Sequence, residues 1–189
     1  MSTTDSLMQL ASRIDINPGE KGSPPIHNWH PQRVLDIDLK IDHQGQWLHK
    51  GAPFLRTSLV RLFSTLLRKE PDGCYYLITP AEKVRVQVAE VPFLIIAAAV
   101  EEQGTNQQIR LETNVSDQLL LDADHPLWVE TLADGEPRPY VRVRDQLDAR
   151  ILPQVFYQLV DLAESVQVNQ QTCLQLRSAG HTFLLGCFD

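Results

Sequence analysis

The stretch YYLITPAEKVRV, Tyr75–Val86, decides which secondary structure is predicted for the middle of the chain. Tyr75–Ile78 has the composition of a strand, and the four residues that follow look like the start of a helix. They offer Thr79 as an N-cap, a proline at the first helical position and a glutamate three residues after the threonine. No helical pattern follows, because valines alternate with polar residues over Val84–Val88. The stretch predicts one capped turn between two strands, with Glu82 capping Thr79.

The residues before this stretch predict a hairpin and then a helix. Val34–Ile41 alternates between apolar and polar residues as a half-buried strand does, and Asp42–Gly45 is typical of a turn. Leu55–Glu70 predicts the clearest helix of the chain, with Arg61 and Arg68 on one face. Its apolar stripe comprises Leu55, Leu59, Leu62, Phe63, Leu66 and Leu67.

The second half repeats this order of elements. The apolar run Val91–Val100 predicts a strand buried on both faces, and Pro153–Ser165 predicts a second helix that begins at its proline. Two short strands around Ser178–Gly180 close the chain. A strand–helix–hairpin order that occurs twice predicts a duplicated α+β fold of two similar small domains with mainly antiparallel sheets. The alternative is that such units are common in α+β proteins.

The domain boundaries follow from composition. We expect an N-terminal helix and linker over residues 1–30, with the helix after Thr4 or Asp5. An N-terminal α+β domain over 31–92 and a C-terminal α+β domain over 93–189 follow.

The charge and the cysteines limit the function classes. A formal net charge of −7 argues against nucleic-acid or anionic-membrane binding. No membrane-length apolar run and no secretion signal are present, so we expect a cytoplasmic protein. Cys74, Cys173 and Cys187 show no C-x-x-C spacing, which predicts reduced, mostly buried thiols.

Several motifs together resemble a known family. PPIHNWHP, DIDLKIDHQGQW, GAPFLRTSLVRLFSTLLRKE, YYLITPAEKVRVQV, LETN, DADHPL and RPYVRVRDQLDAR occur in this order. They resemble the bacterial domain-of-unknown-function 1285 family over roughly Pro24–Leu162. The resemblance implies two domains, a C-terminal half similar to a pleckstrin-homology fold, a nucleotide-like ligand bound between the halves, and a link to signal transduction. The family pattern has an aspartate near Ala89, where this chain offers only Glu90.

In the first half, Arg56 and the turn are the candidate anion contacts. A cation at the start of a helix opposes the helix dipole, so Arg56 invites a partner, either a bound phosphate or the carboxylates of Asp36 or Asp38. The turn after Ile78 predicts a small anion nest with Lys83 as a further charge, and Thr79 as a hydrogen-bond donor. A purely structural turn is the alternative.

In the second half, one strand face carries Tyr140, Arg142 and Arg144. Arginine forks suit phosphate, and Trp47 and His49 match this face in the repeat. We therefore expect Trp47 and Tyr140 to contact an aromatic or sugar portion of a ligand, and Asn114 to add a hydrogen bond. The alternative is a solvated face that Asp145 and Asp148 neutralise.

Other functions stay open. A metal-assisted enzyme acting on a nucleotide or phosphate ester would use Asp36, Asp38 or Glu82, and a protein-interaction module would use the C-terminal half. No catalytic residue, metal site or cofactor is assigned, since the common nucleotide, hydrolase and zinc-protease motifs are absent.

Overall fold

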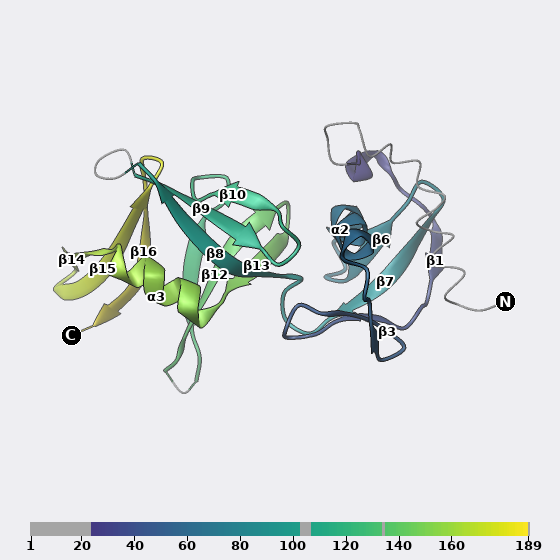
Figure 1. The fold of residues 1–189 in the computed structure, drawn as a ribbon, viewed down its shortest axis with the longest axis horizontal. Coiled ribbons are helices and arrows are strands. Elements are labelled where there is room, and N and C mark those ends of the chain that lie inside the picture. Colours follow the sequence, from purple (N-terminus) through teal and green to yellow (C-terminus); the bar gives the residue numbers. More distant parts are fainter. Residues whose placement is uncertain (1–23, 103–106, 134, 189) are drawn as a thin grey trace. The chain divides into compact units, whose positions relative to one another are not determined.

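The computed structural model describes residues 24–102, 107–133 and 135–188. They form two compact units, of which the first ends at Glu90 and the second begins at Val91 (Figure 1). The helix expected after Thr4 or Asp5 lies outside the described residues.

The first unit is a sheet with one α-helix. The strands are β1 (Arg33–Leu35), β2 (Leu39–Ile41), β3 (Trp47–His49), β4 (Ala52–Pro53), β5 (Leu67–Lys69), β6 (Tyr75–Ile78) and β7 (Glu82–Val88). Their order is β4-β3-β2-β7-β6-β5, and β1 also pairs with β7. Both β1 and β2 run parallel to β7, while the other pairs are antiparallel. A 3-10 turn, η1 (Ile26–Asn28), precedes β1.

The predicted strand Val34–Ile41 is broken into β1 and β2. Between them the N–H of Leu39 turns back to the carbonyl of Ile37 (2.7 Å), and the carbonyl of Asp38 accepts a bond from Lys50 (3.0 Å). The predicted apolar face is nevertheless correct at Ile37, Leu39 and Ile41, which are at most 7% exposed. The alternation therefore located the buried side but not the interruption.

The helix α2 (Thr57–Leu66) is shorter than predicted, and the chain passes directly into β5. The hydroxyls of Ser64 and Thr65 donate to the carbonyls of Arg61 and Leu62 (2.7 Å each), and such local bonds weaken a helix end. Leu67 then becomes extended while staying fully buried. The predicted shared helix face of Arg61 and Arg68 is wrong, because Arg68 lies in β5.

The turn between β6 and β7 is not helical. The N–H of Thr79 bonds to the carbonyl of Glu82 (3.0 Å), and the Thr79 hydroxyl both donates to that carbonyl (2.7 Å) and accepts from the Glu82 N–H (3.1 Å). The Glu82 carboxylate lies beside Arg33 (3.5 Å) rather than capping Thr79. The prediction of a turn joining two strands is correct, and its helical form is wrong.

The second unit contains two sheets and a helix. The first sheet comprises β8 (Phe93–Glu101), β9 (Gln108–Thr113), β10 (Gln118–Leu120), β11 (Leu127–Thr131), β12 (Pro137–Arg144) and β13 (Leu147–Ile151), in the order β10-β9-β8-β13-β12-β11. The second comprises β14 (Glu164–Val168), β15 (Gln171–Ser178) and β16 (His181–Phe188). The helix α3 (Pro153–Asp161) begins at its proline as predicted and contacts β8 and β15 (Figure 1).

Three predictions for this unit need correction. Only residues 92–95 of the apolar run are buried, since Ile96 is 43% exposed and the rest of β8 is exposed or half-buried. The second helix ends at Asp161, and β14 replaces its predicted last turn. The strand β13 was not predicted, although Leu147, Ala149 and Ile151 alternate and are buried.

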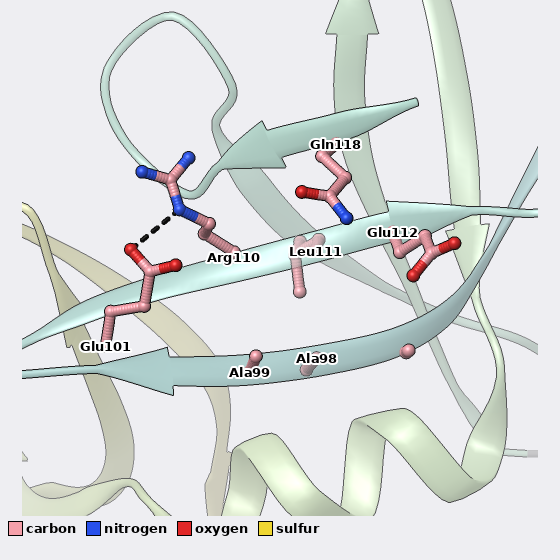
Figure 2. A pocket seen from close by; sticks show the side chains of 8 residues that line it. Ala98, Ala99, Glu101, Arg110, Leu111, Glu112 and Gln118 are labelled. Carbon is pink, nitrogen blue, oxygen red and sulfur yellow. Dashed lines mark hydrogen bonds and ion pairs between the residues drawn. The ribbon is translucent and has the colours of Figure 1, made fainter. Parts of the chain in front are cut away.

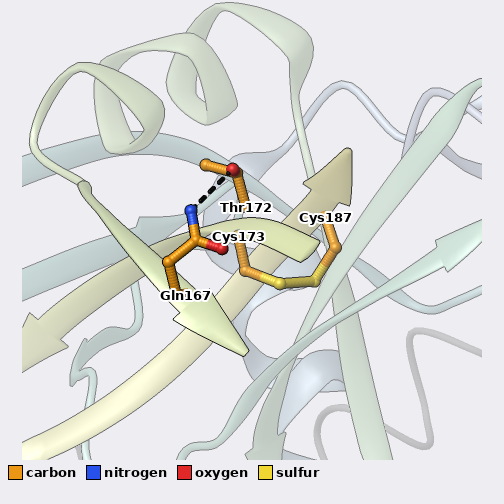
Figure 3. Close-up of a disulfide and its surroundings, with 4 residues drawn as sticks. All are labelled: Gln167, Thr172, Cys173 and Cys187. Carbon is orange, nitrogen blue, oxygen red and sulfur yellow. Dashed lines mark hydrogen bonds between the residues drawn. A yellow bond between two sulfur atoms is a disulfide. The ribbon is translucent and has the colours of Figure 1, made fainter. Parts of the chain in front are cut away.

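The prediction of reduced cysteines is wrong for two of the three. Cys173 in β15 and Cys187 in β16 are cross-strand neighbours with a Cα–Cα distance of 4.0 Å, and they form a disulfide (Figure 3). Cys74 is a free, half-buried thiol. Spacing along the chain could not reveal the pairing, because hairpin register brings the two residues together.

The described residues are mostly β structure with two α-helices, and antiparallel pairing dominates the sheets. This agrees with the α+β prediction at the level of fold class. Neither helix in this part of the chain has the length and apolar composition that crossing a membrane requires.

Candidate ligand-binding site

The predicted contact residues are divided between the two units. Trp47, Arg56, Thr79 and Lys83 lie in the first, and Asn114, Tyr140, Arg142 and Arg144 in the second. Whether each side chain is available to a ligand depends on the protein partners that it already has within its own unit.

Arg56 is the N-cap residue of α2, whereas the predicted helix begins at Leu55 and places Arg56 within its first turn. Its side chain is exposed and has no hydrogen-bond or ion-pair partner among the described residues, and neither expected carboxylate meets it. Asp38 instead lies 3.2 Å from Lys40. The first turn of α2 contains no acidic residue and no side-chain cap, so the helix dipole and the guanidinium both present positive charge here.

Trp47 belongs to the core of the first unit. It is 2% exposed, and its ring lies 6.1 Å from that of Phe63 in α2. Phe54 lies 5.8 Å from Phe63 and 6.3 Å from His49, so four aromatic rings are packed in series. Within the described residues, the buried atoms Trp47 Nε1 and His49 Nε2 have no hydrogen-bond partner. Because Trp47 is buried, its ring has no open face on which a ligand could stack, but its Nε1–H has no hydrogen-bond acceptor among the described residues.

Thr79 and Lys83 are engaged by the protein itself. Thr79 is 7% exposed, and its hydroxyl makes two of the three hydrogen bonds of the turn. The Lys83 ammonium contacts the carboxylate of Glu70 and lies 4.4 Å above the ring of Tyr76. Lys83 therefore stabilises the sheet rather than standing free for an anion.

Glu70 links this lysine to Arg68 in a mostly buried charge network that the sequence did not predict. Arg68 donates to Glu70 (2.5 Å) and to the carbonyls of Ile26 (2.6 Å) and Trp29 (3.0 Å), which fixes η1 against the sheet. Burial would raise the pKa of Glu70, but the hydrogen bonds from Lys83 and Arg68 outweigh it and hold that pKa below its ordinary value. The network is structural.

Tyr76 supplies a test of this region. Its hydroxyl donates to Asp72 (2.8 Å), and that bond together with burial raises the pKa of Tyr76 to about 12 from 10.0. Because the folded value lies above the unfolded one, the stabilisation is complete below pH 10.0 and is lost as the pH rises towards 12. We expect ultraviolet titration of tyrosinate to show one group ionising in this window.

Two variants assign that titration. Tyr76→Phe should remove the late step, and Asp72→Ala should move it back towards the ordinary range while the other tyrosines stay unchanged. A late step that persists in Asp72→Ala would contradict the assignment.

The two predicted basic contacts of the second unit also meet carboxylates of the protein. Arg142 contacts the carboxylate of Asp148 and donates to the carbonyl of Asp145 (2.8 Å), and Arg144 donates to Asp117 (2.8 Å). Of the two aspartates expected to balance this face, Asp148 meets Arg142 with its carboxylate, and Asp145 does so only with its backbone carbonyl. For Arg144 the partner is a residue distant in sequence, and its guanidinium lies 5.1 Å from the Phe93 ring.

Tyr140 and Asn114 hold the sheet together. The Tyr140 ring stacks on Trp128 with centroids 5.7 Å apart, and Tyr140 is 7% exposed. The side-chain oxygen of Asn114 accepts a hydrogen bond from the backbone N–H of Leu94 (3.0 Å), and the backbone N–H of Asn114 donates to the Leu94 carbonyl (2.9 Å). These contacts explain the two residues structurally without a ligand.

A shallow hollow of about 190 Å³ lies on the outer face of β8, β9 and β10. Figure 2 shows the Glu101–Arg110 ion pair (2.7 Å) at one end, Glu112 and Gln118 at the other, and the alanines of β8 between them. The sequence prediction missed it. Three consecutive alanines, residues 97–99, were the available signal, because small side chains leave space on a sheet face.

The enzymatic alternative gains no support from the arrangement of acids. The described residues contain no group of three histidine, cysteine or acidic side chains that could hold a metal ion. His125 lies 3.0 Å from Asp122, whose oxygen also accepts the N–H groups of Asp124 and His125. Burial would raise the pKa of Asp122, but these hydrogen bonds outweigh it and lower that pKa. The cluster is an aspartate-capped turn.

Comparison with known proteins places the chain. Residues 24–91 match the N-terminal domain of DUF1285, a domain of unknown function, and residues 92–185 match its C-terminal domain. A crystal structure of a DUF1285 family protein from Silicibacter pomeroyi DSS-3 is similar with a TM-score of 0.82 and 36% identity, over 96% of this chain and 94% of that one.

A second DUF1285 structure, from Shewanella baltica OS155, has a TM-score of 0.52 and 25% identity, over 66% of this chain and 91% of that one. No curated protein is significantly similar. The motif resemblance is thereby confirmed, and the chain belongs to the DUF1285 family.

Proposed function

We propose that this protein binds a small anionic ligand through Arg56 at the start of α2. The observation that carries the proposal is the contrast among the four predicted basic contacts. Lys83, Arg142 and Arg144 each meet a carboxylate of the protein, whereas Arg56 meets none among the described residues.

The chemistry at Arg56 suits a phosphate or a carboxylate. The first N–H groups of a helix have no intrahelical partner, and the dipole adds partial positive charge at the same end. A guanidinium beside them can make a bidentate contact with an oxyanion. An anion here would supply the missing cap and would neutralise a cation that otherwise opposes the dipole.

The ring nitrogens of β3 are a second set of polar atoms in the first unit that a ligand could satisfy. An unsatisfied buried polar group costs about 1–3 kcal/mol. Trp47 Nε1 and His49 Nε2 are two such atoms within the described residues, and they alternate onto one side of β3. A ligand oxygen or an ordered water at these atoms would remove that cost. In this proposal Trp47 contributes a donor rather than a stacking surface.

We also propose a class of ligand, a fold similarity of the second unit, an origin by duplication and a cellular role. The family resemblance supports a nucleotide-like ligand, a pleckstrin-homology-like second unit and a role in signal transduction in the cytoplasm. A helix followed by a three-stranded antiparallel meander in each unit, α2 with β5–β7 and α3 with β14–β16, supports a duplication. The net charge of −7 supports a small-molecule partner over nucleic acid or a membrane surface.

Arg56→Ala tests the proposal. We expect a thermal-shift screen of the parent against nucleoside phosphates and phosphorylated metabolites to yield at least one stabilising anion. A ligand at a hundred times its dissociation constant adds about 2.7 kcal/mol. Arg56→Ala should lower the affinity for that ligand by roughly tenfold or more, because a hydrogen bond to a charged group contributes about 1.5–3 kcal/mol.

Arg61→Ala is the matched control, since Arg61 is an exposed cation on the same helix. Its affinity for the ligand should equal that of the parent. Equal losses of affinity in both variants would show that the ligand responds only to the overall charge of the helix. A screen in which no anion binds would reject the proposal. Conversion of a bound nucleotide to product, with added divalent metal, would favour the enzymatic alternative.

A further inference from the structure

The Cys173–Cys187 disulfide joins residues of unequal accessibility. Cys173 is 0% exposed and lies in the middle strand of the second sheet, whereas Cys187 is exposed and lies in its last strand (Figure 3). A reagent from solution can therefore reach Cys187 while Cys173 is shielded. Thiol–disulfide exchange requires access of the attacking sulfur, so this asymmetry fixes the order of any exchange.

The end of β16 pairs with residues 172–174 of β15 but buries none of its own residues. Phe183 and Leu185 are 7% and 3% exposed and fix the first part of the strand in the core. The pairing with β15 then shifts register at Leu174/Gln175, and beyond that irregularity residues 186–188 are all exposed. The disulfide is the covalent link of this end, so reduction would leave residues 186–188 held by the ladder with β15 alone and the buried part of the sheet in place.

We propose that Cys173 and Cys187 are a reversible redox modification site, in which Cys187 exchanges with low-molecular-weight thiols and disulfides and Cys173 resolves the product. The reduced chain keeps its fold, because the core residues of β16 are Phe183, which lies before the register shift, and Leu185, which lies at it. That property makes the reaction reversible rather than a single oxidative event during folding.

Oxidation by a small disulfide such as oxidised glutathione proceeds through two successive exchanges. The Cys187 thiolate, having lost its proton to solvent, attacks one sulfur, which breaks the small disulfide and expels one small thiolate. Cys173 then loses its proton and attacks the Cys187 sulfur, which forms the protein disulfide and expels the second small thiolate. The two protein thiols lose two electrons and two protons, and the small disulfide gains the two electrons.

Trapping the intermediate tests the assignment of roles. With oxidised glutathione, Cys173→Ala should accumulate one glutathione on Cys187, because no resolving thiol remains. The reduced parent should instead reach the internal disulfide without an adduct at either position. Intact mass and peptide mapping read both results, and mapping separates any adduct on Cys74.

Cys187→Ser is the matched control and should carry no adduct at Cys173, since that thiol is buried. Cys173→Ala is checked for folding by its cooperative thermal transition. If that transition is lost, the adducts found on Cys187→Ser and on the parent still show which cysteine reacts first. An adduct on Cys173, or a stable adduct on Cys187 of the parent, would overturn the proposal. So would a parent that forms no internal disulfide.

Carboxypeptidase digestion tests the structural consequence. The oxidised parent should resist trimming beyond Asp189, whereas the reduced parent and Cys187→Ser should lose residues 186–188 and keep the cooperative transition. Equal trimming in both redox states, or global unfolding on reduction, would contradict the claim that the bond secures only this end.

Discussion

Phe63→Ala should lower the free energy of unfolding of the first unit by about 3–5 kcal/mol, the range for truncating a buried phenylalanine. Phe63 is 0% exposed, and its ring contacts those of Trp47 and Phe54. Its loss would leave a cavity between α2 and β3 that the neighbouring rings cannot fill. Chemical denaturation followed by circular dichroism and tryptophan fluorescence measures the change.

Leu55→Ala is the control, because the sequence places Leu55 on the same apolar stripe. The structure leaves it 90% exposed before α2 begins, so its truncation should alter stability by no more than about 0.5 kcal/mol. A large loss in Leu55→Ala, or a small one in Phe63→Ala, would show that α2 does not pack through Phe63 as the structure has it.

Glu70→Gln should destabilise the same unit by about 3 kcal/mol, near the lower end of the cost of breaking a buried ion pair. The side chains of Arg68, Glu70 and Lys83 are only 15%, 16% and 17% exposed. Glutamine fills the same volume but removes the charge that both cations require. Because Arg68 also fixes η1, limited proteolysis before β1 should become faster in the variant.

Glu101→Gln supplies the comparison, since Glu101 and Arg110 are 50% and 40% exposed and such pairs contribute less than about 1 kcal/mol. The pH dependence adds a second measurement. The pKa of Glu70 is lowered by folding, so its contribution is present above pH 4.5 and is lost as the pH falls through the folded value. The difference between parent and Glu70→Gln should therefore shrink in acid, and a difference that persists would assign it to another cause.

Local patterns predicted the elements of the fold better than their ends. The alternation in Val34–Ile41 identified the buried face, and the proline of α3 identified its start. The end of α2 depends on bonds from Ser64 and Thr65 to the preceding turn, which propensity alone does not weigh. Leu55 has the spacing of a core residue, but only the position of the helix start shows that it lies outside the stripe.

The candidate site shows a different limit. Sequence reasoning recognised residue types that suit an anion, yet whether a cation is available depends on which carboxylate lies opposite it. Lys83 meets Glu70 across the sheet, and Arg144 meets Asp117 from another turn. Such partners are far apart in the chain, as are the two cysteines of the disulfide. Arg56 stands apart from these residues only once the three-dimensional pairing is known.

The parallel pairs have a consequence for the order in which the chain can fold. Lys40 pairs with Gln87 in the first unit, and Phe93 pairs with Ala149 in the second, so each sheet joins an early strand to a late one. The hairpins within each sheet close only short loops, whereas the parallel pairs β2–β7 and β8–β13 close long loops and so cost more chain entropy. During synthesis β2 and β8 each keep an unpaired edge until β7 or β13 has left the ribosome. Those two edges are where an unfinished chain is most exposed to pairing with the wrong strand.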